Sequence, residues 1–419
     1  MRYDLVFEGG GAKGMVFVGA YEEFIGRGHT LGRLLGTSAG AITAALLAAG
    51  YTPDEMLEAL TEKENGKSVF SGFMGEPAPF TQEEISASAI RALLRNVNLK
   101  LLPGFIENRL DDAITEALAQ NPGARHFFAF VERGGWFAAD RFVAWLTTKL
   151  DSGPWKGAQR RFSSMTLAQF FAATQVDLSV VASDTSDGRL LVLNHRTAPE
   201  CPVVWAVRMS MSIPLVWNEV SWATEWGAYL GRTLTGHTVV DGGVLSNFPI
   251  ELFISDEPQV IKLMGPKQDA AVLGLLIDES LPVPPVARKR GILVDVKVKP
   301  GGLRTVQRIT RLIDTMTGAH DKMVIEEFDH LVARLPAAGY GTTEFDMSDE
   351  RREALVKAGR DAMAAYFDKQ PVRRAATRGP RAARTKRVEP IADRIAARLL
   401  RQCRGLRGGR QRTNPHEGL

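Results

Sequence analysis

The sequence predicts a three-layer α/β/α protein in which helices cover both faces of a central, mostly parallel sheet. Within the first fifty residues, a short apolar run is twice followed by a glycine-containing turn and a segment with helical spacing. The apolar runs are residues 3–8 and 31–36, and the helical segments are residues 15–27 and 41–49. Strand followed by helix, repeated, is typical of parallel strands joined by helical crossovers.

Later segments are expected to bring further turns to the same edge of the sheet. Residues 52–120 have mostly helical spacing, and residues 178–182 and 189–194 are β-runs whose turn-rich connection predicts a hairpin. Residues 203–209 are another strand candidate, and residues 238–240 lead into an aspartate. Because sites in open α/β sheets collect where strands end, we expect these turns to converge.

The chain is expected to divide into three parts. Residues 1–255 hold the motifs described below and form the predicted catalytic core. Residues 256–370 are predicted to be a mostly helical extension packing on that core, with helical segments at 305–328 and 348–367. Residues 371–419 are predicted to be a basic and disordered tail.

Composition limits the class of protein. With 419 residues and 45% hydrophobic content, the chain can bury a large core. Its longest apolar stretch, residues 34–50, falls short of the roughly 20 residues that a membrane span needs. The N-terminus has no secretory-signal pattern and the chain contains two cysteines, so a cytoplasmic protein without a disulfide framework is expected, with export by a non-Sec route left open.

The tail differs strongly in charge from the rest of the chain. Residues 371–419 contain 14 Lys and Arg against 3 Asp and Glu, whereas the whole chain has a net charge of +4. The tail therefore carries +11 and residues 1–370 carry −7. Its one helical candidate is residues 390–403. Such charge suits peripheral contact with an anionic membrane, and it equally suits nucleic acid in a docking protein without hydrolase activity.

The first motif is a G-x-S-x-G sequence at a predicted strand-to-helix turn. Ser38 is framed by Gly36, Thr37, Ala39 and Gly40. Glycines on both sides of a serine permit a cramped turn that presents the hydroxyl above the sheet. The positive end of the following helix favours an anion beside that serine, so Ser38 is a candidate nucleophile.

The second motif is a glycine-rich loop after the first predicted strand. It consists of Gly9, Gly10, Gly11, Ala12, Lys13 and Gly14. This G-x-G-x-x-G pattern also occurs in dinucleotide-binding proteins, but that function expects an acidic residue about 20 positions further on, and residues 29–33 contain none. The alternative is an oxyanion hole of backbone N–H groups, with Lys13 either adding positive charge or lying solvated at the surface.

The third motif is Asp241-Gly242-Gly243, an aspartate at a predicted strand end followed by two turn-forming residues. Most Asp-Gly pairs are simple turns. Here the pair is the third glycine-framed turn of the chain, after those around Gly10 and Ser38.

Together the three motifs resemble the oxyanion loop, nucleophile elbow and Asp-Gly-Gly/Ala motif of the patatin-like phospholipases. Residues 180–189 and 206–214 also resemble that family, so the likeness extends over about residues 4–255. Many members have Arg where Lys13 stands, and Lys lacks the planar fork with which Arg binds phosphate.

The resemblance implies a lipid acyl hydrolase that cleaves carboxylic esters through an acyl-enzyme. It assigns Ser38 as nucleophile and Asp241 as proton acceptor, with Gly10 and Gly11 as the chief oxyanion donors. It implies a lipid or phospholipid substrate, no metal and no organic cofactor. Some enzymes of this kind are active only with a protein activator. The aromatic-rich residues 126–155 fit either a core between helices or a lipid-facing cap.

A Ser-His-Asp esterase of the α/β-hydrolase kind is the nearest enzymatic alternative. In that fold several strands precede the nucleophile, whereas about one predicted strand precedes the strand carrying Ser38. His237 lies close before Asp241 and is the histidine to test. The seven histidines of the chain are His29, His126, His195, His237, His320, His330 and His416.

Overall fold

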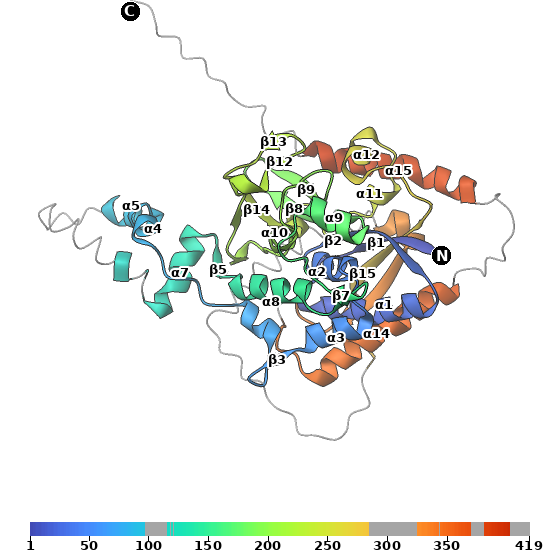
Figure 1. Cartoon of the computed structure of the whole chain (residues 1–419), viewed down its shortest axis with the longest axis horizontal. Helices are drawn as coiled ribbons and strands as arrows, with labels where there is room; N and C mark the ends of the chain where they lie inside the picture. Colours follow the sequence, from blue (N-terminus) through green and yellow to red (C-terminus); the bar gives the residue numbers. More distant parts are fainter. Residues whose placement is uncertain are drawn as a thin grey trace, which may run out of the picture.

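A computed structural model describes residues 1–96, 115–117, 119, 121–284, 325–342, 344–369 and 381–402. Its centre is an eight-stranded sheet in the order β11-β14-β8-β2-β1-β15-β16, with β9 pairing on β8 (Figure 1). The strands are β1 (Arg2–Phe7), β2 (Thr30–Thr37), β8 (Leu178–Asp184), β9 (Arg189–Leu193), β11 (Val220–Ser221), β14 (Thr238–Asp241), β15 (Ala271–Pro282) and β16 (Val332–Ala338).

The sheet is parallel through its middle and antiparallel at one side. Strands β8, β2, β1, β15 and β16 run in the same direction, whereas β9 and β14 run antiparallel to β8. The two predicted β-runs at residues 178–182 and 189–194 form the expected antiparallel hairpin. The prediction of a central, mostly parallel sheet is confirmed.

Helices bury both faces of this sheet. Side chains alternate along each strand, so Leu5 and Phe7 join the larger hydrophobic core while Val6 joins the core of the opposite face. Helices α1 (Val16–Gly26), α2 (Ala39–Ala48), α3 (Pro53–Thr61), α8 (Asp140–Asp151), α9 (Leu167–Thr174), α10 (Val203–Ser210) and α14 (Asp349–Lys369) contribute to the larger core. Helices α11 (Glu251–Ile254), α12 (Pro258–Met264) and α15 (Arg381–Gln402) cover the other face (Figure 1).

A third, small hydrophobic cluster lies away from the sheet. Helices α4 (Gln82–Ser86), α5 (Ala89–Asn96) and α7 (Pro122–Glu132) stand apart at the left of Figure 1. Phe80 and Phe128 meet there with ring centroids 4.4 Å apart. Phe142 and Trp145 are instead buried in the larger core, so the interpretation of the aromatic-rich segment as core holds for these side chains, although Phe127 is 51% exposed.

Short elements complete the described chain. The short strands are β3 (Lys63–Glu64), β4 (Lys67–Ser68), β5 (Gly135–Phe137), β6 (Pro154–Trp155), β7 (Ala158–Gln159), β10 (Leu215–Trp217), β12 (Ala228–Tyr229) and β13 (Arg232–Thr233). The 3₁₀ turns are η1 (Gly11–Met15), η2 (Val69–Phe73), η3 (Thr224–Trp226), η4 (Gly242–Val244) and η5 (Asp329–Leu331). Within the described ranges, no helix has the length and apolar character to cross a bilayer.

The predicted strand at residues 203–209 is wrong, because this segment is helix α10. Pro202 caps the helix at a φ of −63°, and a proline there starts a helix without losing a hydrogen bond. The valines that suggested a strand are buried on the helix, which contacts α8 and β8. Burial of β-branched residues outweighed their strand propensity.

Besides helices, residues 256–370 contain two strands that the sequence did not predict. β15 pairs with β1 and β16 pairs with β15, both parallel, so this segment supplies two strands of the central sheet. α14 matches the helical segment expected at 348–367, whereas most of the segment expected at 305–328 lies outside the described residues. A parallel strand buried on both faces has a continuous apolar run, which is easily confused with a buried helix.

Part of the basic tail is helical and packed on the core. The helix expected at residues 390–403 is found within α15, which begins earlier, at Arg381. Ile395 and Leu399 are buried against the core of α11 and α12. Asp393 accepts hydrogen bonds from the Ser255 hydroxyl at 2.6 Å and the Asp256 N–H at 2.8 Å. At least this part of the tail is therefore ordered by contacts with the body.

Candidate active site

Ser38 lies between β2 and α2 in a conformation that few side chains adopt. Its φ is 54° and its ψ is −120°, and the residue is 6% exposed. A non-glycine residue held in such a region costs on the order of 1–3 kcal/mol, which the surrounding contacts must offset. A Cβ at Gly36 would lie 2.2 Å from the Gly40 carbonyl oxygen, and one at Gly40 would lie 2.3 Å from the Phe7 carbonyl oxygen. The turn therefore requires both glycines.

Backbone hydrogen bonds fix the position of Ser38. Its carbonyl oxygen accepts from Ala41 at 2.9 Å and Ile42 at 3.2 Å, which joins it to the first turn of α2. Its own N–H donates to the Ser210 hydroxyl at 2.9 Å. Sequence reasoning did not identify Ser210 as a site residue, because it assigned the preceding segment to a strand.

Asp241 reaches Ser38 through the register of the sheet. Thr37 of β2 pairs with Val181 of β8, and Asp241 of β14 pairs with Ala182 of the same strand. Ser38 and Asp241 therefore lie at one level on either side of β8, with backbones about 10 Å apart at the usual strand spacing. Their side chains can close that gap. β14 runs antiparallel to β8. Asp241 therefore differs from the usual pattern in which site residues follow the carboxyl ends of parallel strands.

Asp241 is 4% exposed. Burial raises its pKa to about 7, although the Ser38 hydroxyl and the Gly243 N–H both lower it. Oδ1 accepts the Gly243 N–H at 2.7 Å. Oδ2 meets no donor with standard hydrogen-bond geometry among the described residues, which leaves this oxygen available to accept a proton. The group can thus exchange a proton near neutral pH.

The glycine-rich loop passes directly beside the serine. A Cβ at Gly9 would lie 3.0 Å from the Cβ of Ser38, and one at Gly14 would lie 2.9 Å from the Cβ of Ala39. The Gly9 N–H donates to Asn247 and the Ala12 N–H to Thr342.

Two other N–H groups of this loop remain available. The Lys13 N–H is bonded to the Gly10 carbonyl oxygen, but no acceptor within the described chain takes the N–H of Gly10 or Gly11. Gly11 also lines the same cavity as Ser38. These two groups can therefore donate to an oxyanion near the serine.

Lys13 is not the solvated surface residue considered from the sequence. It is 4% exposed, and its ammonium group forms an ion pair with Glu279 near the end of β15. Glu279 is itself 60% exposed in its side chain. The positive charge of Lys13 is thus partly neutralised, and the loop's remaining capacity to hold an anion resides mainly in its backbone.

Asn247 and Glu8 support the loop and were also missed from the sequence. The Asn247 side-chain amide donates to the Gly9 carbonyl oxygen at 2.9 Å. A Glu8 carboxylate oxygen accepts the Ile277 N–H of β15 at 2.6 Å. These contacts join the loop to the segment after Asp241 and to a strand of the C-terminal part. No motif marks them, because each partner lies more than 200 residues away.

The cavity beside Ser38 is apolar. Its free interior, at the size of a water molecule, is about 60 Å³, and it is partly open to solvent. Most of its lining side chains are aliphatic, aromatic or methionine, and few are charged. Such a lining suits a hydrocarbon chain. The large apolar side chains are Met15, Ile42, Leu60, Phe70, Phe73, Met211, Ile213, Trp217, Phe345 and Met347.

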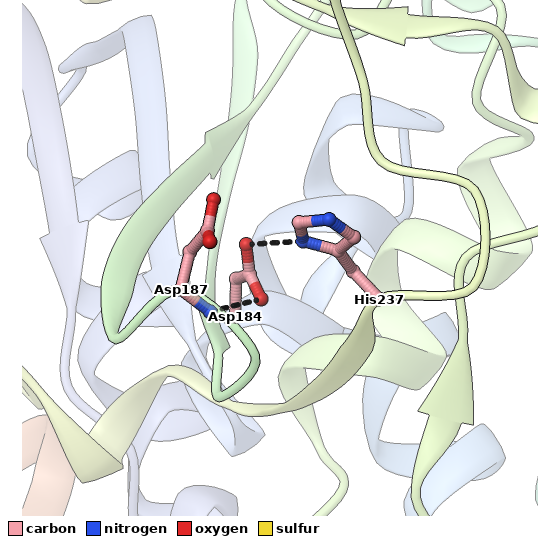
Figure 2. Close-up of side chains that lie close together, drawn as sticks. All are labelled: Asp184, Asp187 and His237. Atoms are coloured by element: carbon pink, nitrogen blue, oxygen red, sulfur yellow. Dashed lines mark hydrogen bonds and ion pairs between the residues drawn. The ribbon is translucent and has the colours of Figure 1, made fainter. Parts of the chain in front are cut away.

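His237 faces a different carboxylate from the one beside Ser38. Its Nδ1 lies 3.0 Å from Oδ2 of Asp184, and Figure 2 shows the ring turned toward that residue. Among the described residues that line the cavity with Ser38, none is a histidine. The geometry therefore gives no support to a Ser-His-Asp triad built on His237.

The group of Asp184, Asp187 and His237 also has the composition of a metal site, with ligand atoms within 4.8 Å of one another. However, arginine side chains already form ion pairs with one of its carboxylates. Arg189 lies 2.6 Å and Arg232 3.3 Å from the Asp187 carboxylate. Two guanidinium groups next to a carboxylate favour an ion-pair network over a bound cation.

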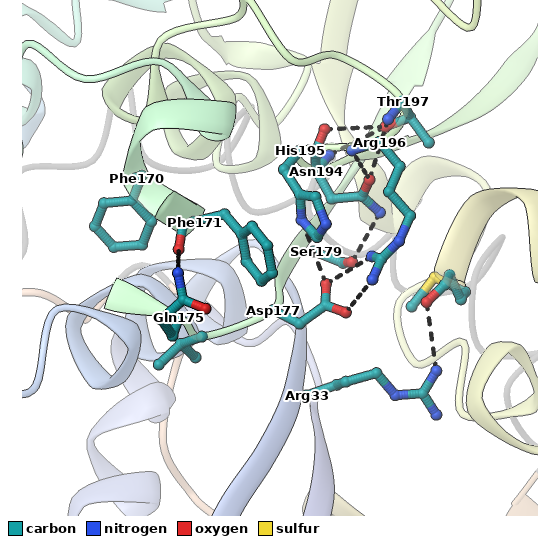
Figure 3. Close-up of polar contacts among 12 residues, drawn as sticks. Arg33, Phe170, Phe171, Gln175, Asp177, Ser179, Asn194, His195, Arg196 and Thr197 are labelled. Carbon is teal, nitrogen blue, oxygen red and sulfur yellow. Dashed lines mark hydrogen bonds and ion pairs between the residues drawn. The ribbon is translucent and has the colours of Figure 1, made fainter. Parts of the chain in front are cut away.

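A second polar cluster lies at the opposite end of β8 (Figure 3). Arg196 forms two hydrogen bonds, of 2.9 and 2.7 Å, with the carboxylate of Asp177 just before that strand. The His195 ring stacks on Phe171 with centroids 3.7 Å apart. Asn194 joins Ser179 at 3.0 Å. The cluster joins the start of β8 to the residues that follow β9, at the end of β8 away from Ser38.

Curated relatives are found for most of the chain. The chain is 27% identical over 367 residues to the uncharacterized protein YqhO of Bacillus subtilis (strain 168). This match covers 86% of the chain and 96% of that protein. It is 22% identical over 251 residues to the probable lipid hydrolase 463L of Invertebrate iridescent virus 6, covering 60% of this chain and 62% of that protein.

Solved structures also resemble this chain. VipD from Legionella pneumophila matches with a TM-score of 0.42 and 16% identity, covering 87% of this chain and 66% of that one. The type III effector ExoU matches with a TM-score of 0.36 and 17% identity, covering 96% of this chain and 61% of that one. The chain thus spans less than two thirds of either solved chain.

The family model described as Patatin-like phospholipase matches residues 5–254. This range includes the glycine-rich loop, the Ser38 turn and the Asp-Gly-Gly motif at Asp241, and it spans more than half of the 419 residues. The chain belongs to the patatin-like phospholipase family.

Proposed function

We propose that this family member hydrolyses carboxylic esters of lipids through an acyl-enzyme on Ser38, with Asp241 as the only side-chain base. The supporting observation is the placement of both residues at one level across β8, with Ser38 on the wall of an apolar cavity. A lipid or phospholipid with an acyl chain in that cavity is the proposed substrate, and no metal or organic cofactor takes part.

In the first step, the Asp241 carboxylate accepts the Ser38 hydroxyl proton while Oγ bonds to the ester carbonyl carbon. The oxygen that becomes negative is held by the N–H groups of Gly10 and Gly11. When the ester C–O bond breaks, the alcohol leaves with the proton from Asp241, and the acyl group stays on Ser38. The positive end of α2 further stabilises the charge that develops at the serine.

In the second step, water replaces the alcohol. Asp241 accepts a proton from that water, whose oxygen attacks the acyl carbon, and the same N–H groups hold the oxyanion. The acyl–Oγ bond then breaks, the proton returns to Ser38, and the fatty acid leaves. A base with a pKa of about 7 suits both transfers, because it is partly ionised at neutral pH and still basic enough to accept a proton.

The test is hydrolysis of p-nitrophenyl esters and mixed phospholipid vesicles by wild type, Ser38→Ala and Asp241→Asn, with folding checked by circular dichroism. Each variant is expected to lose at least about 10³-fold in kcat/KM while remaining folded. Full activity of Ser38→Ala would contradict the proposal.

His237→Ala is the matched control, since this histidine pairs with Asp184 rather than with the proposed dyad. It is expected to keep activity within about tenfold of wild type, because its effect on Asp241 is indirect. A loss as complete as that of Ser38→Ala would replace the dyad with a triad. If wild type itself is inert, the same panel is repeated with candidate protein activators, and continued inactivity would argue against a hydrolase.

A further inference from the structure

A segment beyond the region matched by the family model closes part of the candidate active site. Residues 340–342 and 344–347, here called the strap, follow β16 and precede α14. Glu344 holds the strap together, because it pairs with Arg351 at 2.8 Å and accepts the Gly341 N–H at 3.0 Å. Arg351 also lies over the Tyr340 ring, 4.0 Å from its centroid. These contacts give the strap a defined shape.

The strap contacts the glycine-rich loop directly. The Thr342 carbonyl oxygen accepts the Ala12 N–H at 2.9 Å. Gly11 has a φ of +56°, and a Cβ there would lie 2.1 Å from the same oxygen. Only a glycine therefore allows this approach, and the strap takes part in positioning the N–H groups that are proposed to hold the oxyanion.

The strap also forms one wall of the apolar cavity. Phe345 and Met347 line it together with Trp217, and the Phe345 and Trp217 rings meet edge to face with centroids 6.1 Å apart. Trp217 is fixed in turn by a hydrogen bond of 2.9 Å from its Nε1 to the Phe73 carbonyl oxygen. Phe345 and Met347 are 9% and 4% exposed, so their side chains occupy space within the cavity wall rather than at the surface.

We infer that the strap sets the acyl-chain selectivity of this enzyme, with Phe345 and Met347 limiting the length or bulk of the chain that the cavity accepts. The inference rests on the proposed function and adds a determinant from outside residues 5–254. Selectivity follows from volume: removing a large side chain from the wall makes room for further methylene groups, and each methylene moved out of water favours binding.

The experiment compares kcat/KM for p-nitrophenyl butyrate, octanoate and palmitate in wild type, Phe345→Ala and Met347→Ala. We expect the palmitate-to-butyrate ratio to rise at least about tenfold in both variants. Phe253→Ala is the matched control, because Phe253 is 2% exposed in the core on the opposite face of the sheet. It is expected to lose stability without changing the ratio. Unchanged ratios in the strap variants, or the same change in the control, would overturn the inference.

A binding measurement separates this inference from the proposed hydrolysis. Fluorescence of parinaric acid, a polyene fatty acid, reports entry of a hydrocarbon chain in Ser38→Ala, which has no nucleophile. Adding Met347→Trp to that background fills the cavity and is expected to weaken binding at least about tenfold, while adding Phe253→Ala is not. Binding unaffected by Met347→Trp would overturn the inference even if Ser38-dependent hydrolysis is established. A selective loss would support it even if no ester is cleaved.

Discussion

At the scale of single residues, the candidate site depends on close backbone approaches that exclude side chains. Ser38 holds a φ of 54° because the neighbouring glycines let β2, α2 and the Phe7 carbonyl come together. The turn can therefore be predicted from its composition. The residue that accepts the Ser38 N–H cannot, since Ser210 lies 172 positions away and belongs to a helix whose sequence resembled a strand.

Gly40→Ala tests this steric requirement. Its Cβ would lie 2.3 Å from the Phe7 carbonyl oxygen, so backbone must shift, and we expect a loss of at least about 2 kcal/mol in the free energy of unfolding together with most of the activity. Gly26→Ala is the control, because its Cβ would meet nothing within 4 Å at the end of α1. Chemical denaturation and ester hydrolysis check both. Equal stability of the two variants would contradict this account of the turn.

Asp241→Asn should make stability depend less on pH. The pKa of Asp241 is raised from 3.8 to about 7 by burial, so the folded state holds this proton more tightly than the unfolded state. Its contribution to stability is complete below pH 3.8 and is lost as pH rises to about 7. We expect Asp241→Asn to melt near wild type at pH 4 but about 5 °C or more above it at pH 8. A difference independent of pH would show that Asp241 is not held protonated by burial.

At the scale of secondary-structure elements, the N-terminal part of the sheet could be predicted from the sequence better than the C-terminal part. The two strand-to-helix units at Ser38 and the 178–194 hairpin have local glycine and turn signals, and the structure contains them. Strands β15 and β16 are not followed by a glycine-framed turn into a helix of the kind at Ser38. Their place in the central sheet depends on pairing with β1 and with each other, which is a long-range property.

Helix α15 is the element whose removal is most informative. Its residues Ala392, Ile395, Ala396 and Leu399 are buried with α11 and α12. Truncation before residue 371 exposes the apolar side chains they cover, and we expect the melting temperature to fall by about 5 °C or more. Truncation after residue 402 keeps α15 and serves as the control. Equal melting temperatures would contradict the packing of α15 on the body.

At the scale of the whole molecule, charge is distributed unevenly. Residues 1–370 carry a net −7 and residues 371–419 a net +11, so orientation toward an anionic surface is the expected consequence. Because α15 packs on the core, deleting the tail would remove apolar packing as well as charge. Substituting exposed arginines separates the two effects.

Arg394→Glu with Arg398→Glu is the sharper variant, since both side chains are exposed on α15. Each basic residue near an anionic membrane contributes about 1 kcal/mol, so we expect at least about tenfold weaker binding to phosphatidylserine-containing vesicles in a sedimentation assay. Lys156→Glu with Arg161→Glu changes the charge equally at exposed positions elsewhere and is the control. The same loss in both pairs would mean that overall charge, rather than α15, governs the contact.

Covalent trapping shows whether Ser38 is the residue that forms the acyl-enzyme. A fluorophosphonate reacts with a serine that an adjacent base and oxyanion donors activate, and mass spectrometry locates the modified peptide. We predict one adduct on Ser38 in wild type, slower labelling below pH 7 as Asp241 gains its proton, and no adduct in Ser38→Ala. Wild type that stays unreactive even with the candidate protein activators, or an adduct that persists on another residue in Ser38→Ala, would rule out Ser38 as the nucleophile.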